Sequence, residues 1–370
     1  MATSLLNQPS IILVLSLLGL YLFASLIQSI FIAYRRHLFK QARGCKPVPK
    51  YPQRDPILGS DLFIQNTKYA KNGGFLEMIK GRYGIVGATT FTAQLPGQQF
   101  IQTAEPENIK AMLATQFKDF ELPAIRKGAF APIFGHGIFT TDGLEWETSR
   151  SLLRPNFNRA QVADLDMLEN HVSKVIARIP RDGSTVDLQT LFFMLTLDSA
   201  TEFLFGHSAG SLDFGHSHER GMKFAQAFTD STTQSGNIVR VPAAFSFLLK
   251  TKKFKADVKY VHEYVSAYVQ KAVDLHEHGT AEKNDKYVFL EELAKTGFGA
   301  KKIQDELLNI LLAGRDTTAG LLSYLFYTLA REPRVFKKLQ AEIAELNGQR
   351  PTYEQVKGMR YLQWVVNEGK

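Results

Sequence analysis

The feature that most constrains the fold of this chain is one long apolar stretch with a polar centre. It runs from Leu307 to Leu322, and its flanks are apolar enough to form a buried helix. Its centre holds two glycines, a carboxylate and two hydroxyls. A buried carboxylate without partners costs several kcal/mol, and glycine inside a helix costs about 1 kcal/mol relative to alanine. A sequence that accepts both costs at one place usually has a use for that place.

Composition describes a folded protein with a membrane segment. The chain has 370 residues, enough for one large domain or two ordinary ones, and is 45% hydrophobic and 22% charged. The net charge is +8, from 44 basic and 36 acidic residues. Part of this excess follows the first apolar run, so membrane lipid explains it better than nucleic acid, and no nucleic-acid motif accompanies it. We expect a lipid partner and no nucleic-acid partner.

The first apolar run predicts a membrane anchor. After a short segment, 1–10, the run covers 11–34 and is about 36 Å long as a helix, enough to span a bilayer with some tilt. A buried core helix is the alternative, but it fits this length and position poorly. Basic side chains follow the run, so the positive-inside rule predicts a single-pass protein whose body faces the cytosol.

A basic and proline-rich hinge is expected over 35–59. It contains Cys45, the only cysteine of the chain, so no intrachain disulfide is possible. The absence of a disulfide agrees with a cytosol-facing body, and we interpret Cys45 as an inert linker residue.

The body over 60–370 is expected to be mainly α with a small β-sheet. The predicted hairpin consists of a strand over 85–92, a turn near Pro96 and a strand over 98–103. Apolar residues then recur at helical spacing. The predicted helices cover 75–82, 165–179, 188–203, 258–275 and 303–331, with further helices starting at Pro333, at a Thr352 capping box and at Tyr361. No zinc-type spacing occurs; His216 to His218 is interpreted as a polar loop.

Two motifs carry candidate chemistry. Asp316 and Thr317 have the groups for proton transfer inside an apolar pocket, and Gly314 leaves backbone open to a small ligand. A polar stripe that faces another helix is the alternative for this motif. Trp146 and Arg150 have i,i+4 spacing, which places a ring beside a guanidinium. Such an arginine binds a carboxylate, including that of a cofactor, or forms a surface salt bridge.

Together these features resemble the membrane-bound cytochrome P450 superfamily of heme-thiolate monooxygenases. The markers are the anchor and hinge, the Trp146 to Arg150 motif, and Ala313 to Thr318 on the central helix. The chain is also similar, more narrowly, to the fungal alkane and fatty-acid hydroxylases. That likeness rests on the stretches 43–47, 55–59, 152–157 and 200–206.

The resemblance implies a cytochrome P450 fold and specific roles. Trp146 and Arg150 are expected to hold a propionate of heme b, Ala313 and Gly314 to border the oxygen pocket, and Asp316 and Thr317 to deliver protons. Phe130 and Phe134 are candidates for a substrate channel wall, with core packing as an equal alternative. The implied partners are an NADPH-dependent cytochrome reductase and a hydrophobic long-chain substrate, and the implied location is the endoplasmic reticulum membrane.

One departure from the family sets a further expectation. The family holds its iron through a cysteine in a downstream F-x-x-G-x-x-x-C-x-G loop, and this sequence has no such loop. Glu368 matches the start of the E-x-x-R motif of the family, whose arginine is missing. We therefore expect a fold without its C-terminal part, an incomplete monooxygenase domain over 60–370 with no axial cysteine, doubtful heme retention and no activity by this chain alone.

Two other functions are kept open. The chain is alternatively a non-catalytic, membrane-anchored fragment that pairs with a reductase or a full-length relative. Weak heme binding through a histidine is disfavoured, because no histidine lies near the central motif in sequence.

Overall fold

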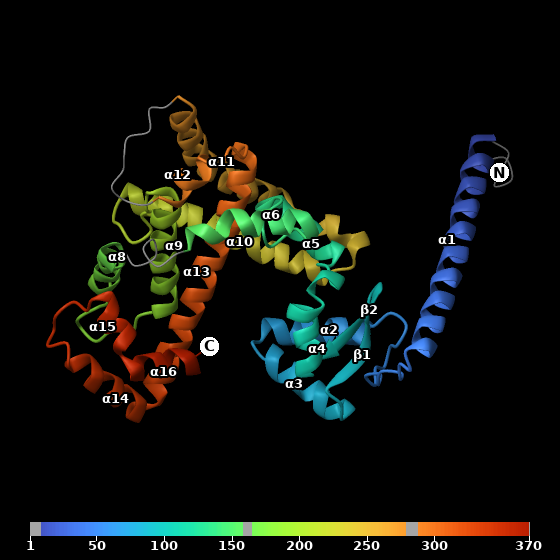
Figure 1. Ribbon diagram of the computed structural model, residues 1–370, viewed down its shortest axis with the longest axis horizontal. Coiled ribbons are helices and arrows are strands. Elements are labelled where there is room, and N and C mark those ends of the chain that lie inside the picture. Colours follow the sequence, from blue (N-terminus) through green and yellow to red (C-terminus); the bar gives the residue numbers. More distant parts are fainter. Residues whose placement is uncertain (1–8, 158–164, 279–287, 370) are drawn as a thin grey trace. The chain divides into compact units, whose positions relative to one another are not determined.

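The computed structural model describes residues 9–157, 165–278 and 288–369. Most of the predicted N-terminal segment 1–10 therefore lies outside the described residues. The chain divides into two compact units, Met1–Ala111 and Met112–Lys370, which are described separately below. The described residues are mainly helical with one small sheet (Figure 1), which confirms the predicted fold class.

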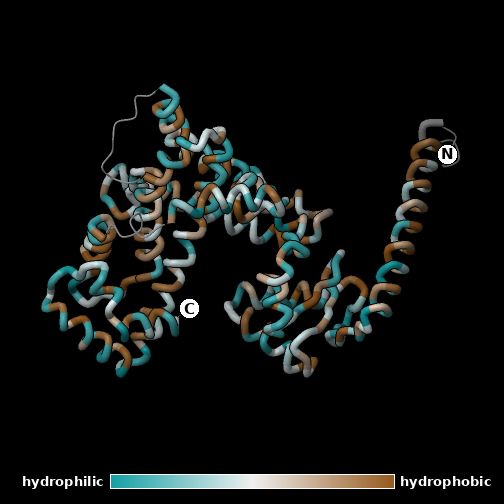
Figure 2. Tube along the Cα trace, viewed as in Figure 1, coloured by the Kyte–Doolittle hydropathy of each residue, from teal (hydrophilic) through white to brown (hydrophobic). Residues whose placement is uncertain are grey.

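Helix α1 (Pro9–Ala42) is a long helix that is apolar over most of its length. Its 34 residues make it about 51 Å long, which exceeds the hydrocarbon thickness of a bilayer. Figure 2 shows the apolar residues along it, and among the described helices it is the one long and apolar enough to cross a membrane. The helix continues beyond the predicted segment 11–34 through basic residues of good helix propensity, and it ends before Gly44, whose φ is 62°.

The rest of the first unit combines short helices with a hairpin. Strands β1 (Thr90–Leu95) and β2 (Gln98–Thr103) pair antiparallel, with Thr90 opposite Thr103. The predicted hairpin is present and β2 has the predicted range, but β1 covers Thr90–Leu95, so the strand predicted over 85–92 begins five residues too early. Ile85 lies in the last turn of a helix that runs to Val86, because the β-branched pattern there is too short to override the helix before it. The helices are α2 (Ser60–Lys71), α3 (Phe75–Val86) and α4 (Pro106–Lys110).

A small core joins α2 to the hairpin. Leu62, Phe91 and Ala93 are buried together, and the Tyr83 ring meets the Phe91 ring edge-on at 5.3 Å between centroids. Gly59, just before α2, has a φ of 66°, and a Cβ there would lie 2.1 Å from the Gln94 carbonyl oxygen. The 55–59 stretch therefore requires glycine at its end, since no larger residue fits against β1.

The second unit is built from helices. Its described elements begin with π-helix η1 (Ala111–Thr115), which starts at the boundary between the units, and 3-10 helix η2 (Phe117–Asp119). The others are α5 (Ala124–Phe134), α6 (Gly143–Leu153), η3 (Arg154–Asn156), α8 (Leu165–Ala177), α9 (Leu188–Phe205), α10 (His216–Arg240), η4 (Ala243–Leu249), α11 (Lys252–Glu277), α12 (Phe289–Ala294), α13 (Ala300–Arg331), α14 (Pro333–Ala344), α15 (Tyr353–Gly358) and α16 (Arg360–Glu368).

Helix α13 organises this unit. It packs most extensively on α9 and also contacts α11, α12, α5 and α14 (Figure 1). Leu307, Leu308 and Leu311 are fully buried in the main core. The predicted helices correspond to α3, α8, α9, α11, α13, α14 and α16, and the predicted capping box at Thr352 is present at the start of α15.

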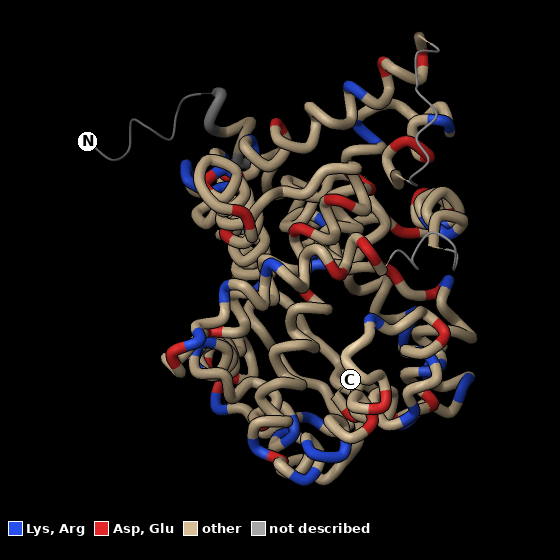
Figure 3. The backbone as a smooth tube through the Cα atoms, turned by 90° about the vertical axis from the view of Figure 1, so that its left-hand side faces the viewer, with Lys and Arg blue, Asp and Glu red and all other residues tan. Residues whose placement is uncertain are grey.

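Several helices were not predicted. Helix α10 is rich in Ser, Thr and Gly, which are weak helix formers, so its 25 residues depend on tertiary packing. Phe224 and Phe228 anchor it in the core. His216 to His218 form its first turn and not the predicted loop. Basic and acidic residues both occur along the described chain (Figure 3), as expected for a solvated surface.

The hydrogen bonds that stabilise the turn at Asp55 can be tested through their pH dependence. The Asp55 carboxylate accepts hydrogen bonds from the Ile57, Leu58 and Ser60 amides and from the Ser60 hydroxyl. The Ser60 hydroxyl and these amides lower the pKa of Asp55 from 3.8 to about 2. The stabilisation is therefore present above the unfolded pKa and is lost as pH falls through the folded one.

We expect the Leu58 and Ser60 amides to keep their hydrogen-exchange protection down to a pH of about 4 and to lose it progressively toward about 2. In Asp55→Asn, which cannot titrate, this step should vanish. The same step in both proteins would contradict the assignment.

Candidate functional site

The polar centre of α13 begins at Arg315, whose side chain is 6% exposed. Its Nη1 forms an ion pair with Asp316 Oδ1 at 3.0 Å, and its Nη2 donates a hydrogen bond to the Thr229 hydroxyl on α10 at 2.7 Å. The guanidinium also lies over the rings of Phe193 on α9, at 5.0 Å, and Phe228 on α10, at 5.6 Å. A single side chain thus connects three helices.

The environment of Arg315 is unusual for a charged group. Burial lowers the pKa of Arg315, and the neighbouring Asp316 carboxylate partly restores it. A guanidinium remains protonated at neutral pH because its intrinsic pKa is so high. Two aromatic faces, one hydroxyl and one carboxylate offset its loss of hydration.

Asp316 differs from the sequence prediction in one respect. Its side chain is 36% exposed, so it is not sealed in an apolar pocket, and Arg315 supplies the partner that an isolated carboxylate would lack. Burial raises the pKa of Asp316, and the positive charge of Arg315 opposes that rise. The carboxyl group can therefore exchange protons with solvent on one side while Arg315 holds it on the other.

Thr317 and Ala313 lie one above the other on α13. The Thr317 hydroxyl donates to the Ala313 carbonyl at 2.6 Å, the i−4 bond common for hydroxyl side chains in helices. Thr317 is exposed. Gly314 faces α9 instead, since a Cβ there would meet the Ala200 methyl at 3.7 Å. Ordinary van der Waals distance leaves room for a methyl group at Gly314, so this contact alone does not require glycine.

Trp146 and Arg150 on α6 lie side by side, as predicted. The Arg150 guanidinium lies over the Trp146 ring at 5.5 Å, and the Phe117 ring also contacts that ring, at 4.8 Å between centroids. Arg150 is exposed. Among the described residues no carboxylate forms an ion pair with it, so the surface salt bridge offered as the alternative is not formed there.

Phe130 and Phe134 form core contacts. Phe134 is 1% exposed and meets the Phe228 ring edge-on at 6.1 Å, and Phe130 stacks on Phe134 at 6.0 Å. Packing, one of the two alternatives from the sequence, describes their position. Cys45 is exposed and belongs to the first unit, whereas Trp146, Arg150 and the α13 motif belong to the second.

Comparison with known proteins identifies the family. A family model described as Cytochrome P450 matches residues 49–369. The chain is 42% identical over 363 residues to a cytochrome P450 monooxygenase of Aspergillus japonicus, a match that covers 94% of this chain and 64% of that relative. It is 40% identical over 363 residues to cytochrome P450 52A13 of Debaryomyces hansenii, covering 93% and 69%. With cytochrome P450 52A4 of Candida maltosa the identity is 44% over 316 residues, covering 80% and 56%.

This chain belongs to the cytochrome P450 family. It spans about two thirds of the length of the first two of these relatives and less of the third. The family implies heme, and two observations of the second unit agree with a heme edge. Arg150 offers an exposed guanidinium without a described carboxylate partner, and the exposed Thr317 lies one turn from Ala313 on α13, within the residues that the family model matches.

The sequence interpretation gave no role to Arg315 or to the polar residues near the start of α13. Lys302, Glu306 and Asn309 lie at spacings of four and three residues, which places them on one helix face, and that spacing was a signal available in the sequence. No described hydrogen bond joins the α6 pair directly to the Ala313 to Thr317 motif. The two are linked through Ser149 of α6, which accepts a hydrogen bond from Lys302 of α13 at 2.8 Å.

A double-mutant cycle tests the Arg315 pair. Arg315→Met should lower the free energy of unfolding by about 2 kcal/mol, because it leaves a half-buried carboxylate without its partner; the exposure of Asp316 keeps this below the cost of breaking a fully buried pair. Adding Asp316→Asn should recover part of the loss, since the orphaned charge is then gone. Chemical denaturation measures both, and additive effects would contradict the coupling.

Proposed function

We propose that this chain carries the distal, oxygen-facing half of a membrane-bound heme monooxygenase that hydroxylates n-alkanes or fatty acids. The observation that best supports this is the α13 motif: a half-buried Asp316 held by Arg315, next to the Ala313 and Thr317 pair, in a chain of the cytochrome P450 family. Heme, when bound, supplies the iron at which dioxygen is activated with electrons from an NADPH-dependent reductase.

The residues of this chain then have separate tasks. Arg150, with Trp146 beside it, binds a heme propionate through a charge-assisted hydrogen bond. Ala313 would provide a small side chain next to the oxygen, and Gly314 beside it, on the side that faces α9, would add no bulk there. Asp316 would take a proton from solvent on its exposed side and pass it toward the Thr317 hydroxyl, whose bond to the Ala313 carbonyl would hold that hydroxyl in place as the next proton carrier.

Substrate and location are part of the same proposal. The stretches shared with the fungal hydroxylases favour a long-chain hydrocarbon or fatty-acid substrate. Helix α1 and the basic residues in its last turns favour a single-pass anchor in the endoplasmic reticulum membrane, with the body facing the cytosol.

Titration of the purified full-length chain with hemin tests the heme site. We expect a Soret change together with quenching of Trp146 fluorescence, measured in a Trp364→Phe background because the chain has only two tryptophans. Arg150→Met should weaken hemin binding by about tenfold, since it removes one charge-assisted hydrogen bond.

Arg154→Met is the matched control, because Arg154 is an exposed arginine one turn further along the chain. Equal weakening by both variants would indicate nonspecific attraction to the hemin carboxylates. Absence of any Soret change would favour the alternative, a non-catalytic membrane-anchored protein.

A further inference from the structure

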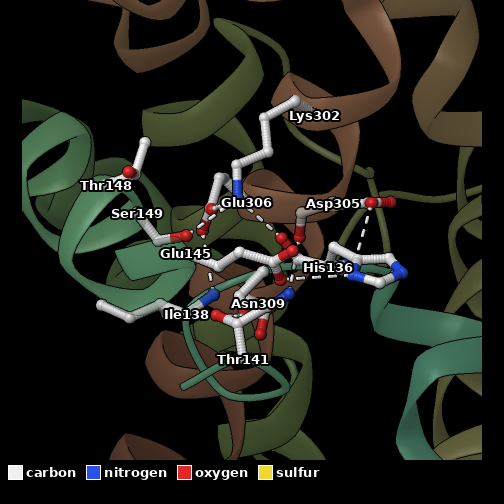
Figure 4. Close-up of polar contacts among 12 residues, drawn as sticks. His136, Ile138, Thr141, Glu145, Thr148, Ser149, Lys302, Asp305, Glu306 and Asn309 are labelled. Atoms are coloured by element: carbon white, nitrogen blue, oxygen red, sulfur yellow. Dashed lines mark hydrogen bonds and ion pairs between the residues drawn. The ribbon is translucent and has the colours of Figure 1, made fainter. Parts of the chain in front are cut away.

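The loop between α5 and α6, residues 135–141, wraps around polar side chains of α13 that follow it by about 170 residues (Figure 4). The His136 amide donates to Asp305 Oδ2 at 3.0 Å, and the Ile138 amide donates to Glu306 Oε2 at 3.1 Å. The Phe139 amide donates to Asn309 Oδ1 at 3.0 Å. Three backbone donors of one short loop are thus satisfied by one helix.

These acceptors lie inside the protein. Asp305 is 3% exposed, and Glu306 and Asn309 are fully buried. Lys301 neutralises Asp305, and Lys302 forms an ion pair with Glu306 at 2.7 Å. Buried carboxylates are costly unless both a counter-charge and hydrogen-bond donors are present. Each carboxylate here has both, so the arrangement fixes the loop in one position.

The loop approaches α13 more closely than side chains would allow. A Cβ at Gly135 would lie 2.0 Å from Asp305 Oδ2, and a Cβ at Gly137 would lie 2.0 Å from Asn309 Nδ2. The Asn309 amide also donates to the Phe134 carbonyl at 2.9 Å, which ties the end of α5 to the same helix. Two glycines and one amide therefore specify this contact.

Lys302 extends the contact to α6 itself. Its ammonium group donates to the His136 carbonyl at 2.6 Å and to the Ser149 hydroxyl on α6 at 2.8 Å. Ser149 is fully buried and is the neighbour of Arg150 in the chain. Figure 4 shows Lys302 and Ser149 pointing toward each other.

The contacts share a helix face with the candidate oxygen pocket. Lys302, Glu306, Asn309, Ala313 and Asp316 follow one another at spacings of four, three, four and three residues, so they form one stripe. Asn309 precedes Ala313 by about 6 Å along the axis. One rigid helix thus carries the residues that hold α6 and the residues that face oxygen.

We propose that Lys302, Glu306 and Asn309 are positioning residues that set α6, and with it Trp146 and Arg150, in register with Ala313 and Asp316. This inference rests on the proposed function, because the register matters only where both sets of residues address one heme. The residues act through the loop and through Ser149, not by touching the cofactor.

Trp146 fluorescence tests the positioning without heme. In a Trp364→Phe background, Asn309→Leu and Lys302→Met should increase acrylamide quenching of Trp146 about twofold, and Asn309→Leu should speed exchange of the Phe139 amide about tenfold. Glu306→Gln keeps an oxygen for the Ile138 amide and should preserve most of the signal, whereas Glu306→Leu should not. Ser149→Ala removes a single hydroxyl and should act in the same direction if a larger change prevents folding.

Asp198→Asn is the matched control. Asp198 is also fully buried and accepts hydrogen bonds from loop amides, those of Ser211 and Leu212, but it lies on α9 and has no described hydrogen bond or ion pair with α6. Equal effects of Asp198→Asn and Asn309→Leu on Trp146 would indicate general loosening and overturn the proposal. An unchanged Trp146 signal together with faster Phe139 exchange would also overturn it.

Hemin titration separates this inference from the proposed function. If both hold, Asn309→Leu weakens hemin binding in the same direction as Arg150→Met. If the native chain binds no hemin while the Trp146 and exchange results are as expected, the proposed function fails and the mechanical link between α13 and α6 remains. If the native chain binds hemin and Asn309→Leu binds it equally well, the positioning role is wrong.

Discussion

The structure of the second unit depends on how α13 satisfies polar groups inside an apolar core. The leucines of α13 are buried in the core, as expected. Four polar or charged residues of the same helix are buried as well: Asp305, Glu306, Asn309 and Arg315. Each of these would strongly destabilise the fold if it lost its partners. Their partners outside α13 come from α5, α9, α10 and the loop between α5 and α6, so these elements cannot shift independently of α13. The helix serves as the common reference for its neighbours.

The two polar regions of α13 differ in what they hold. Near its start, side-chain oxygens accept hydrogen bonds from backbone amides, which is a geometric constraint with little freedom. In its middle, Arg315 is held by aromatic faces and a hydroxyl, and in turn holds a carboxylate that remains partly exposed. The contacts near the start of α13 suit the positioning of a neighbouring loop. The Arg315 contacts in its middle suit a carboxyl group, that of Asp316, that must change its protonation state. Both occur on one continuous helix, so its rigidity couples them.

Much of the architecture could be predicted from the sequence because long periodic segments encode their own burial. Helices α9, α11 and α13 have apolar residues at helical spacing, and the Thr352 capping box was visible as a pattern of four residues. Helix α10 was missed because its residues favour no single local structure and its formation depends on Phe224 and Phe228 in the core. The strand predicted over 85–92 starts five residues too early for the related reason that a short β-branched pattern is compatible with the end of α3.

For the candidate site, the sequence by itself determined which residue types are present and their spacing. It placed Asp316 and Thr317 in the middle of a helix and put Trp146 beside Arg150, because i,i+4 spacing fixes neighbours on a helix regardless of what surrounds it. Only the tertiary structure decided that Arg315 pairs with Asp316 and reaches Thr229, and that Asn309 holds a loop 170 residues earlier in the chain. These contacts join segments far apart in sequence, and no local pattern encodes them, because they depend on which helices pack against one another.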